Sequence, residues 1–229
     1  MNSLFIISLP RSFSSETYRV SQTALGLSPP SWTTDGEILN LDRYSLFPGP
    51  IHDTGIKFVA REREPQLFRR VTDFLEQVVK PAGFIYKDVV NPFVVSEWLK
   101  GRDLRVLRIK RDLTDVVFAM LTRQWLYPHR AVGDGRGRTE EAMIEGLVRA
   151  DAALAAVPAV ELDFDDLISD ESPLRDALMK LYPDFEGLNV SYMDDGFHSR
   201  KEAVLSRRKT DVYRAVRDKV LKVSATQTV

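Results

Sequence analysis

Short apolar runs alternate along the chain with longer segments whose apolar residues recur at helical spacing. Four runs have the length and composition of buried strands: 4–9, 83–88, 104–109 and 159–164. Six segments have the periodicity or the capping residues of helices: 14–26, 64–80, 91–100, 112–125, 138–157 and about 200–222. Strands that alternate with helices form βαβ units, so the pattern predicts an α/β fold, with a central parallel sheet and helices on both faces.

The length of the chain suits one domain. With 229 residues, 44% of them hydrophobic, it can bury a sizeable core, and no linker-like stretch divides it, so we expect a single domain over 1–229. Segment 28–63 is rich in Pro, Gly, Asp and Thr and is too long for an ordinary connection, which predicts a lid or a substrate-binding insert. The tail after Lys222 is expected to be frayed.

Charge and composition exclude several classes of function. The 32 basic and 33 acidic residues give a net charge of −1, whereas nucleic-acid binding usually requires a strong basic excess. The absence of Cys excludes disulfides and thiolate chemistry, and the three His residues lack metal-ligand spacing, so we expect no metal site. No apolar run approaches the roughly 20 residues of a membrane span, and the N-terminus lacks the features of a signal peptide. We therefore expect a soluble, cytoplasmic protein.

Basic residues follow three of the predicted strands. The first strand leads into the turn Pro-Arg-Ser-Phe-Ser-Ser at 10–15, the second ends near Lys87, and the third is followed by Arg111. In a parallel sheet ligands bind beyond the carboxyl ends of the strands, and a helix N-terminus there attracts anions. The sequence thus predicts a local site for a small, highly charged ligand. The simpler interpretation, in which Arg11 and the serines only cap a helix, stays open.

Four stretches carry a family likeness. They read, in order along the chain, LFIISLPRSFSSETYRV from Leu4, FIYKDVVNPF from Phe84, LRVLRIKRDLTDVVFAML from Leu104 and AVELDFDDLISDESPL from Ala159. They resemble four motifs of the P-loop sulfotransferases: the 5′-phosphosulfate loop, a Lys-Asp-Pro strand end, the strand and Arg that bind a 3′-phosphate, and a later acidic strand and helix. Together they cover roughly the core of the chain.

The resemblance implies an enzyme that transfers a sulfuryl group from 3′-phosphoadenosine-5′-phosphosulfate (PAPS) to a hydroxyl of a small-molecule, lipid-linked or carbohydrate acceptor. The spent donor would be 3′,5′-adenosine bisphosphate (PAP), and no metal is required. Arg11 would contact the sulfuryl or bridging oxygens and Arg111 the 3′-phosphate. With two residues from the basic segment 199–209, whose simpler interpretation is a solvated helix face, the expected donor-binding set is Arg11, Ser12, Phe13, Ser14, Ser15, Glu16, Arg111, Ala119, Arg200 and Lys201.

The expected catalytic set consists of Arg11, Glu37, Lys87 and His52. Glu37 resembles the Glu that bacterial and tyrosine-type members use as a base. His52 is the alternative base, because a His has a suitable pKa for proton transfer. Lys87 could instead serve only to pair with Asp88 or with a helix carboxylate.

Two departures from the family pattern keep other functions open. Phe13 stands where the loop normally has Gly, and Ala119 stands where a Ser normally touches the 3′-phosphate, although Thr122 lies close enough in sequence to compensate. The chain is thus either a divergent enzyme or a non-catalytic nucleotide- or partner-binding relative. An ATP-using P-loop phosphotransferase is a further alternative, which the missing Gly-Lys-[Ser/Thr] disfavours.

Overall fold

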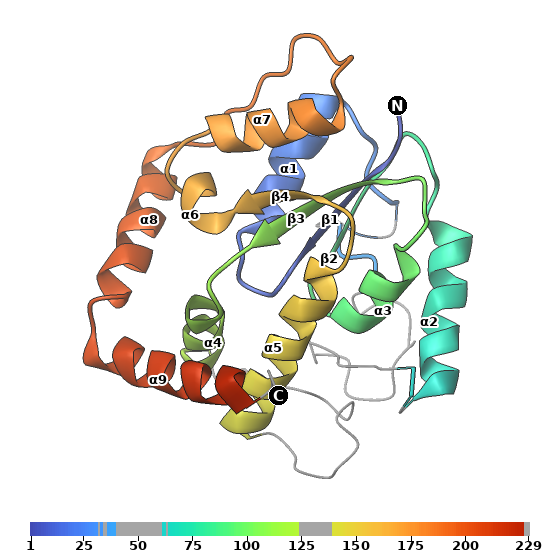
Figure 1. The fold of residues 1–229 in the computed structure, drawn as a ribbon. Coiled ribbons are helices and arrows are strands. Elements are labelled where there is room, and N and C mark those ends of the chain that lie inside the picture. The colour runs from blue at the N-terminus through green and yellow to red at the C-terminus, as the bar shows by residue number, and fades with distance from the viewer. Residues whose placement is uncertain (32, 34–35, 40–60, 63, 124–138, 227–229) are drawn as a thin grey trace.

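A sheet of four parallel strands lies at the centre of the protein (Figure 1). The structure is a computed structural model that describes residues 1–226 except 32, 34–35, 40–60, 63 and 124–138. The strands are β1 (Leu4–Ser8), β2 (Ile85–Asp88), β3 (Arg105–Lys110) and β4 (Val160–Asp163), and they lie in the order β2-β1-β3-β4. The predicted α/β fold with a parallel sheet is confirmed, and the described residues form one domain.

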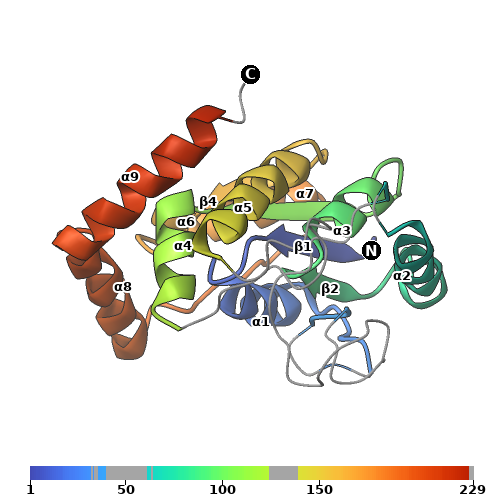
Figure 2. The ribbon, with the colours of Figure 1, turned by 90° about the horizontal axis from the view of Figure 1, so that it is seen from below.

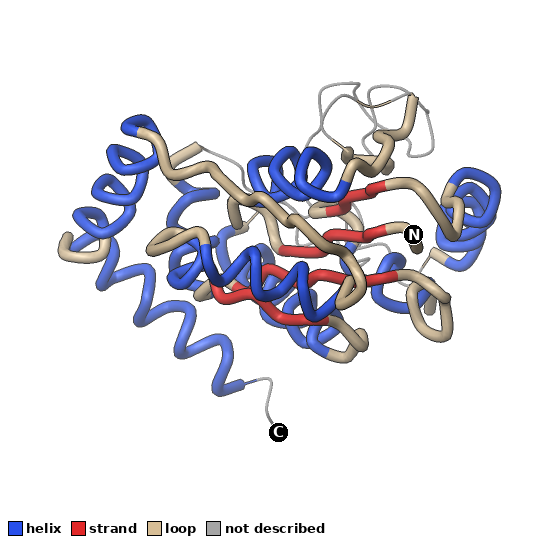
Figure 3. Tube along the Cα trace, turned by 90° about the horizontal axis from the view of Figure 1, so that it is seen from above, coloured by secondary structure: helices blue, strands red, loops and turns tan. Residues whose placement is uncertain are grey.

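The helices cover both faces of the sheet. They are α1 (Ser14–Leu25), α2 (Pro65–Val78), α3 (Pro92–Trp98), α4 (Leu113–Leu121), α5 (Glu140–Ala155), α6 (Phe164–Leu167), α7 (Ser172–Leu181), α8 (Asp195–Arg207) and α9 (Asp211–Thr226). Figure 3 shows helices on both sides of the strands, and Figure 2 shows α1 and α5 on opposite faces.

Alternate residues of β1 supply two separate cores. Phe5 and Ile7 pack with α2 to α5 and α9, whereas Leu4 and Ile6 pack with α1 and α6 to α8. Because successive side chains of a strand point to opposite faces, a central strand that is buried on both faces must be apolar throughout. This explains why the run from Leu4 is continuous rather than alternating.

The C-terminal part differs from the prediction. The helix expected at about 200–222 is two helices, α8 and α9, which are separated at residues 208–210. Phe197 of α8 packs in one core and Tyr213 of α9 packs in the other, so a single straight helix cannot bury both. Thr210 also caps α9, since its Oγ1 accepts a hydrogen bond from Tyr213 N (3.2 Å). The helix continues to Thr226, so the expected fraying after Lys222 is wrong for 223–226.

Helix α7 was not predicted. Its buried residues Leu174, Ala177, Leu178 and Leu181 have clear helical spacing. The lid or substrate insert expected at 28–63 lies largely outside the described residues, so that role stays a prediction.

The part of this insert around Gly36 extends the sheet beside β2. Gly36 accepts a hydrogen bond from Lys87 N (2.8 Å), and Ile38 N donates to the Lys87 carbonyl (3.2 Å). Gly36 has a φ of 78°, and a Cβ there would lie 2.1 Å from the buried ring of Tyr18. Glycine is therefore required for both conformation and space, and it places Glu37 next to Lys87.

We expect Gly36→Ala to lower the free energy of unfolding by about 2–5 kcal/mol, because strain at positive φ and overpacking add. Gly101→Ala is the matched control, since Gly101 has a similar φ of 76° but a Cβ added there would meet nothing within 4 Å. It should cost only about 1–2 kcal/mol. Urea-induced unfolding measures both, and equal losses would show that the contact with Tyr18 is unimportant.

Candidate functional site

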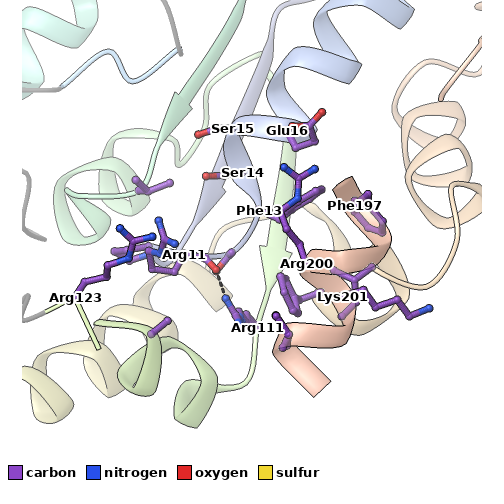
Figure 4. Close-up of a pocket in the computed structure, with 18 of the residues that line it drawn as sticks. Arg11, Phe13, Ser14, Ser15, Glu16, Arg111, Arg123, Phe197, Arg200 and Lys201 are labelled. Carbon is purple, nitrogen blue, oxygen red and sulfur yellow. Dashed lines mark hydrogen bonds between the residues drawn. The ribbon is translucent and has the colours of Figure 1, made fainter. Parts of the chain in front are cut away.

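A cavity of about 690 Å³ opens at the carboxyl ends of the strands. Its lining includes residues of the turn after β1, the start of α1, the segments that follow β2 and β3, α4, α6 and α8, and several of them are labelled in Figure 4. All ten expected donor-binding residues line it: Arg11, Ser12, Phe13, Ser14, Ser15, Glu16, Arg111, Ala119, Arg200 and Lys201. Of the expected catalytic residues, Arg11 and Glu37 line it, Lys87 is buried beside it, and His52 lies outside the described residues.

The turn after β1 has an unusual backbone. Arg11 and Phe13 both have a φ of 65°, in the left-handed region that costs a non-Gly residue about 1–2 kcal/mol. The Phe13 carbonyl accepts hydrogen bonds from both the N–H and the Oγ1 of Thr17 (3.1 Å each). With this φ, Phe13 adopts a backbone conformation that Gly adopts more readily. Backbone strain of this kind is concentrated at functional sites.

Helix α1 begins at this turn without a side-chain cap. Phe13, the N-cap residue, makes no capping hydrogen bond, and the first intrahelical donor is Thr17 N. The N–H groups of Ser14, Ser15 and Glu16 precede that bond, so the positive end of the helix is available to an anion in the cavity.

Ser12 adds a second sign of a ligand. Its side chain is fully buried, lines the cavity, and has no hydrogen-bond partner for its Oγ among the described residues. A buried hydroxyl without a partner is costly. An anion bound at the start of α1 would satisfy it.

Arg111 joins the end of β3 to this turn. Its Nη1 donates a hydrogen bond to the Arg11 carbonyl (Figure 4), and its guanidinium lies 4.0 Å from the centre of the Phe164 ring. Burial lowers the pKa of Arg111, but an arginine remains charged at neutral pH. Its Nε is buried and faces the Asp115 carboxylate at 3.6 Å. Arg111 thus fixes the turn and connects it to Asp115.

Asp115, one helical turn after Arg111, connects the site to the C-terminal helices. It accepts hydrogen bonds from Arg208 Nε (3.1 Å to each oxygen) and from the Tyr213 hydroxyl (2.8 Å), and lies 3.6 Å from Arg111 Nε. Burial acts to raise the pKa of Asp115, but the bonds from Arg208 and Tyr213 outweigh it and hold the pKa below its ordinary value. The sequence pattern gave no sign of the partner Arg208, which lies far away in sequence.

Lys87 is fully buried behind the start of α1. Its Nζ donates a hydrogen bond to Ser15 Oγ (2.8 Å) and lies 3.2 Å from Glu37 Oε1. The carboxylate that Lys87 pairs with is Glu37 of the insert, whereas we expected Asp88 or a helix carboxylate. The same ammonium therefore links the carboxylate from the insert to the first turn of α1.

Positive charge dominates the cavity wall. Two acidic residues, Glu16 and Glu37, line it, against six basic ones: Arg11, Arg111, Arg123, Arg200, Lys201 and Arg207. Burial first, and then repulsion from Arg123 and Arg207, lowers the pKa of Arg11. Such crowding of like charges suits a ligand with several negative charges. Arg123 and Arg207 were not predicted as site residues, because their places at the ends of α4 and α8 depend on the tertiary fold.

The proposed compensation for Ala119 by Thr122 is not observed. Thr122 Oγ1 donates a hydrogen bond to the Ala119 carbonyl (3.1 Å), within the end of α4. Arg123, the next residue, is the one that lines the cavity. The side chain that the end of α4 adds to the cavity wall is thus a cation and not the hydroxyl of Thr122.

The described residues contain no group of three or more His, Asp or Glu side chains placed to hold a metal ion. None of the helices in the described ranges has the length and apolar character needed to cross a membrane.

No protein-family model matches the chain, and no curated protein matches it. Among solved structures it is similar to the sulfotransferase domain from the curacin biosynthetic pathway, with 13% identity over 83% of this chain and 74% of that one and a TM-score of 0.45. It is also similar to a sulfotransferase from Alicyclobacillus acidocaldarius, with 14% identity over 92% of this chain and 98% of that one and a TM-score of 0.47.

Asp88, at the end of β2, predicts a dependence of stability on pH. It accepts hydrogen bonds from Val90 N (3.1 Å) and from Asn91 N (2.7 Å). Burial outweighs these bonds and raises the pKa of Asp88 from 3.8 to about 6. The folded state therefore holds the proton more tightly than the unfolded state, and this stabilising contribution is lost as the pH rises from about 4 to about 6.

We expect Asp88→Asn to remove this loss. Relative to the wild type, the variant should gain on the order of 2 kcal/mol in unfolding free energy between pH 4 and pH 7. Urea-induced unfolding across that range measures the difference, with Asp176→Asn on the exposed surface of α7 as the control. A constant difference between wild type and Asp88→Asn would mean that Asp88 has an ordinary pKa in the folded protein.

Proposed function

We propose that the protein is a sulfotransferase that moves a sulfuryl group from PAPS to a hydroxyl of a small-molecule or glycan acceptor. The observation that carries the proposal is the convergence of three strand ends on one cavity: the strained turn with the uncapped start of α1, Lys87 at the end of β2, and Arg111 after β3. These residues belong to the motifs that resemble those of the sulfotransferases, and their proximity in the fold supports the proposal.

The cavity fits the donor in charge and size. The N–H groups of 14–16 and the Ser12 hydroxyl, which has no partner among the described residues, suit the 5′-phosphosulfate as hydrogen-bond donors. Arg111 suits the 3′-phosphate, because a planar guanidinium can bind phosphate oxygens in pairs. A volume of about 690 Å³ lies within the range of small-molecule and cofactor sites.

Sulfuryl transfer requires aligned reacting atoms and stabilisation of the growing negative charge, and it requires no covalent intermediate with the protein. PAPS would supply the sulfuryl group, and the chain's own residues would align it and stabilise the negative charge that grows on the leaving oxygen. Lys87 is held at the first turn of α1 through Ser15, and Arg11 stands in the preceding turn. Arg11 can therefore place positive charge where the leaving oxygen would lie, and Lys87 adds to the positive potential there from behind α1.

Glu37 is the base that this arrangement favours. It lines the cavity, and the pairing with Lys87 fixes its carboxylate close to the start of α1. From there it can accept the proton of an acceptor hydroxyl as sulfur is attacked. His52 stays an alternative base that lies outside the described residues.

One observation favours a second candidate function. Ala119 lines the cavity without the hydroxyl that the sulfotransferase pattern has at this position. A non-catalytic relative that binds the nucleotide would need Arg111 and the turn but no acceptor base. Binding and turnover therefore have to be measured separately.

The donor assignment predicts a preference for the 3′-phosphate. In calorimetric titrations without metal, PAP should bind at least tenfold more tightly than AMP or ATP. Arg111→Met should remove that preference, and because Arg111 also bonds to the Arg11 carbonyl, the AMP affinity should fall too, but by less than the PAP affinity. Measurable AMP binding shows that the pocket is still formed in the variant. Arg214→Met is the control, because Arg214 forms an exposed pair with Asp211 on α9. Equal affinities of the wild type for PAP and AMP would contradict the assignment.

The base assignment predicts a separation of turnover from binding. Glu37→Gln should lower kcat by about 10²–10⁴-fold and leave PAP affinity within about threefold. Product formation from PAPS with a panel of hydroxyl acceptors measures kcat. Glu97→Gln, whose partner is the exposed Arg61, serves as the control.

Three results are possible in that assay. Loss of turnover in Glu37→Gln alone supports the enzyme and its base. Normal turnover in Glu37→Gln shifts the role of base to another residue, with His52 next. Tight PAP binding without any sulfated product would favour the non-catalytic relative.

A further inference from the structure

Phe13 is an unexpected residue for its backbone conformation. Its φ of 65° lies in the region that glycine adopts freely, so backbone conformation alone would favour Gly. Contacts of the Phe13 side chain must therefore offset the unfavourable backbone conformation.

The ring belongs to a three-membered aromatic cluster. Phe13 meets Phe197 edge-on, with centroids 5.1 Å apart and an interplanar angle of 77°, and lies 6.3 Å from Tyr192. Tyr192 and Phe197 are themselves 5.3 Å apart at 68°. Both partners are buried, and edge-to-face geometry at these distances is attractive. The cluster therefore attaches the turn after β1 to the start of α8.

The partners of Phe13 are firmly held on the core. The Tyr192 hydroxyl lies within hydrogen-bond distance of the carbonyls of Leu167 (2.7 Å) and Asp170 (2.8 Å), and its single hydrogen is donated between them. The N–H groups of Tyr192 and Met193 both bond to Glu171 Oε1, at 2.6 and 2.7 Å. The segment before α8 is thus fixed, and the ring of Phe13 connects it to the turn after β1.

Helix α8 turns one face toward the cavity. Residues Arg200, Ala203, Val204 and Arg207 line it at helical spacing. Arg200 also lies 5.8 Å from the centre of the Phe13 ring, a cation–π contact. In Figure 4 Arg200 lies beside Phe13, whereas the ammonium of Lys201 points away from the turn. At the other end of the helix, Arg208 bonds to Asp115 and Asp165.

We propose that Phe13 is a positioning residue. Its ring locks α8 against the turn after β1 and aims Arg200 at the anionic ligand, so the side chain, and not the backbone, is what this position needs. The identity of the ligand rests on the proposed function, but the contact between Phe13 and α8 does not. With Phe rather than Gly at this position, the geometry of the turn is coupled to the position of the basic helix α8.

A double-mutant cycle tests this coupling. In the wild-type background Arg200→Ala should weaken PAP binding about tenfold, and in the Phe13→Gly background it should weaken binding less than twofold. Phe13→Gly alone should weaken PAP binding about tenfold although it relieves the backbone, and Phe13→Tyr, which keeps the ring, should bind as the wild type does. Leu205→Ala, on the exposed side of α8, is the control.

Hydrogen exchange gives a readout without ligand. In the unliganded protein, Phe13→Gly should speed amide exchange in α8 at least tenfold and leave α7 unchanged. If Phe13→Gly does not fold, Phe13→Leu replaces it in both measurements, because leucine keeps apolar volume and loses the ring contacts.

The outcomes separate this inference from the proposed function. Additive effects in the cycle together with unchanged exchange in α8 would overturn the role of Phe13. If the wild type does not bind PAP, the donor assignment fails, and the exchange measurement alone decides: faster exchange in α8 supports the positioning role, and unchanged exchange overturns it.

Discussion

The parallel pairing of β1 between β2 and β3 is the constraint on which the site depends. The register places Ile7 opposite Asp88 and Ser8 opposite Ile109, so the three strands end at the same edge of the sheet. The turn after β1, Lys87 and Arg111 meet there without any of them being close in sequence. A slip of one residue would turn each side chain of the slipped strand to the other face and separate these groups. The two apolar cores that β1 supplies are what hold the register.

Buried charges then connect the outer segments to this edge. Lys87 reaches Glu37 of the insert and Ser15 of α1, and Asp115 reaches Arg208 between α8 and α9. A buried charge without a partner is expensive, so each pair fixes the segment that contributes the partner. The charged residues around the cavity thus have two roles, because they hold the outer segments in place and they set the potential of the cavity. Phe13 has a similar role through an apolar contact, because its ring attaches the start of α8 to the turn after β1.

Much of this arrangement could be predicted from the sequence. The strands followed from the apolar runs, and the gathering of Arg11, Ser12 and Arg111 followed from the rule that parallel strands end at one edge. What could not be predicted depends on long-range packing. Thr210, which caps α9, is a local sign of the break between α8 and α9, but the apolar pattern runs on through it. The break is needed because Phe197 and Tyr213 belong to different cores. Arg123 and Arg207 enter the cavity only through the placement of their helices, and the partnership of Asp115 with Arg208 spans two distant segments. The left-handed conformation of Phe13 ran against its residue type.

A crystal structure of the protein with PAP tests the central claim most directly. We expect the 5′-phosphate within hydrogen-bond distance of the N–H groups of 14–16 and of Ser12 Oγ, and the 3′-phosphate on the guanidinium of Arg111. In that position the 5′-phosphate would also lie close to Lys87, at the first turn of α1. PAP bound outside the cavity, or bound with neither phosphate at the start of α1, would contradict the account.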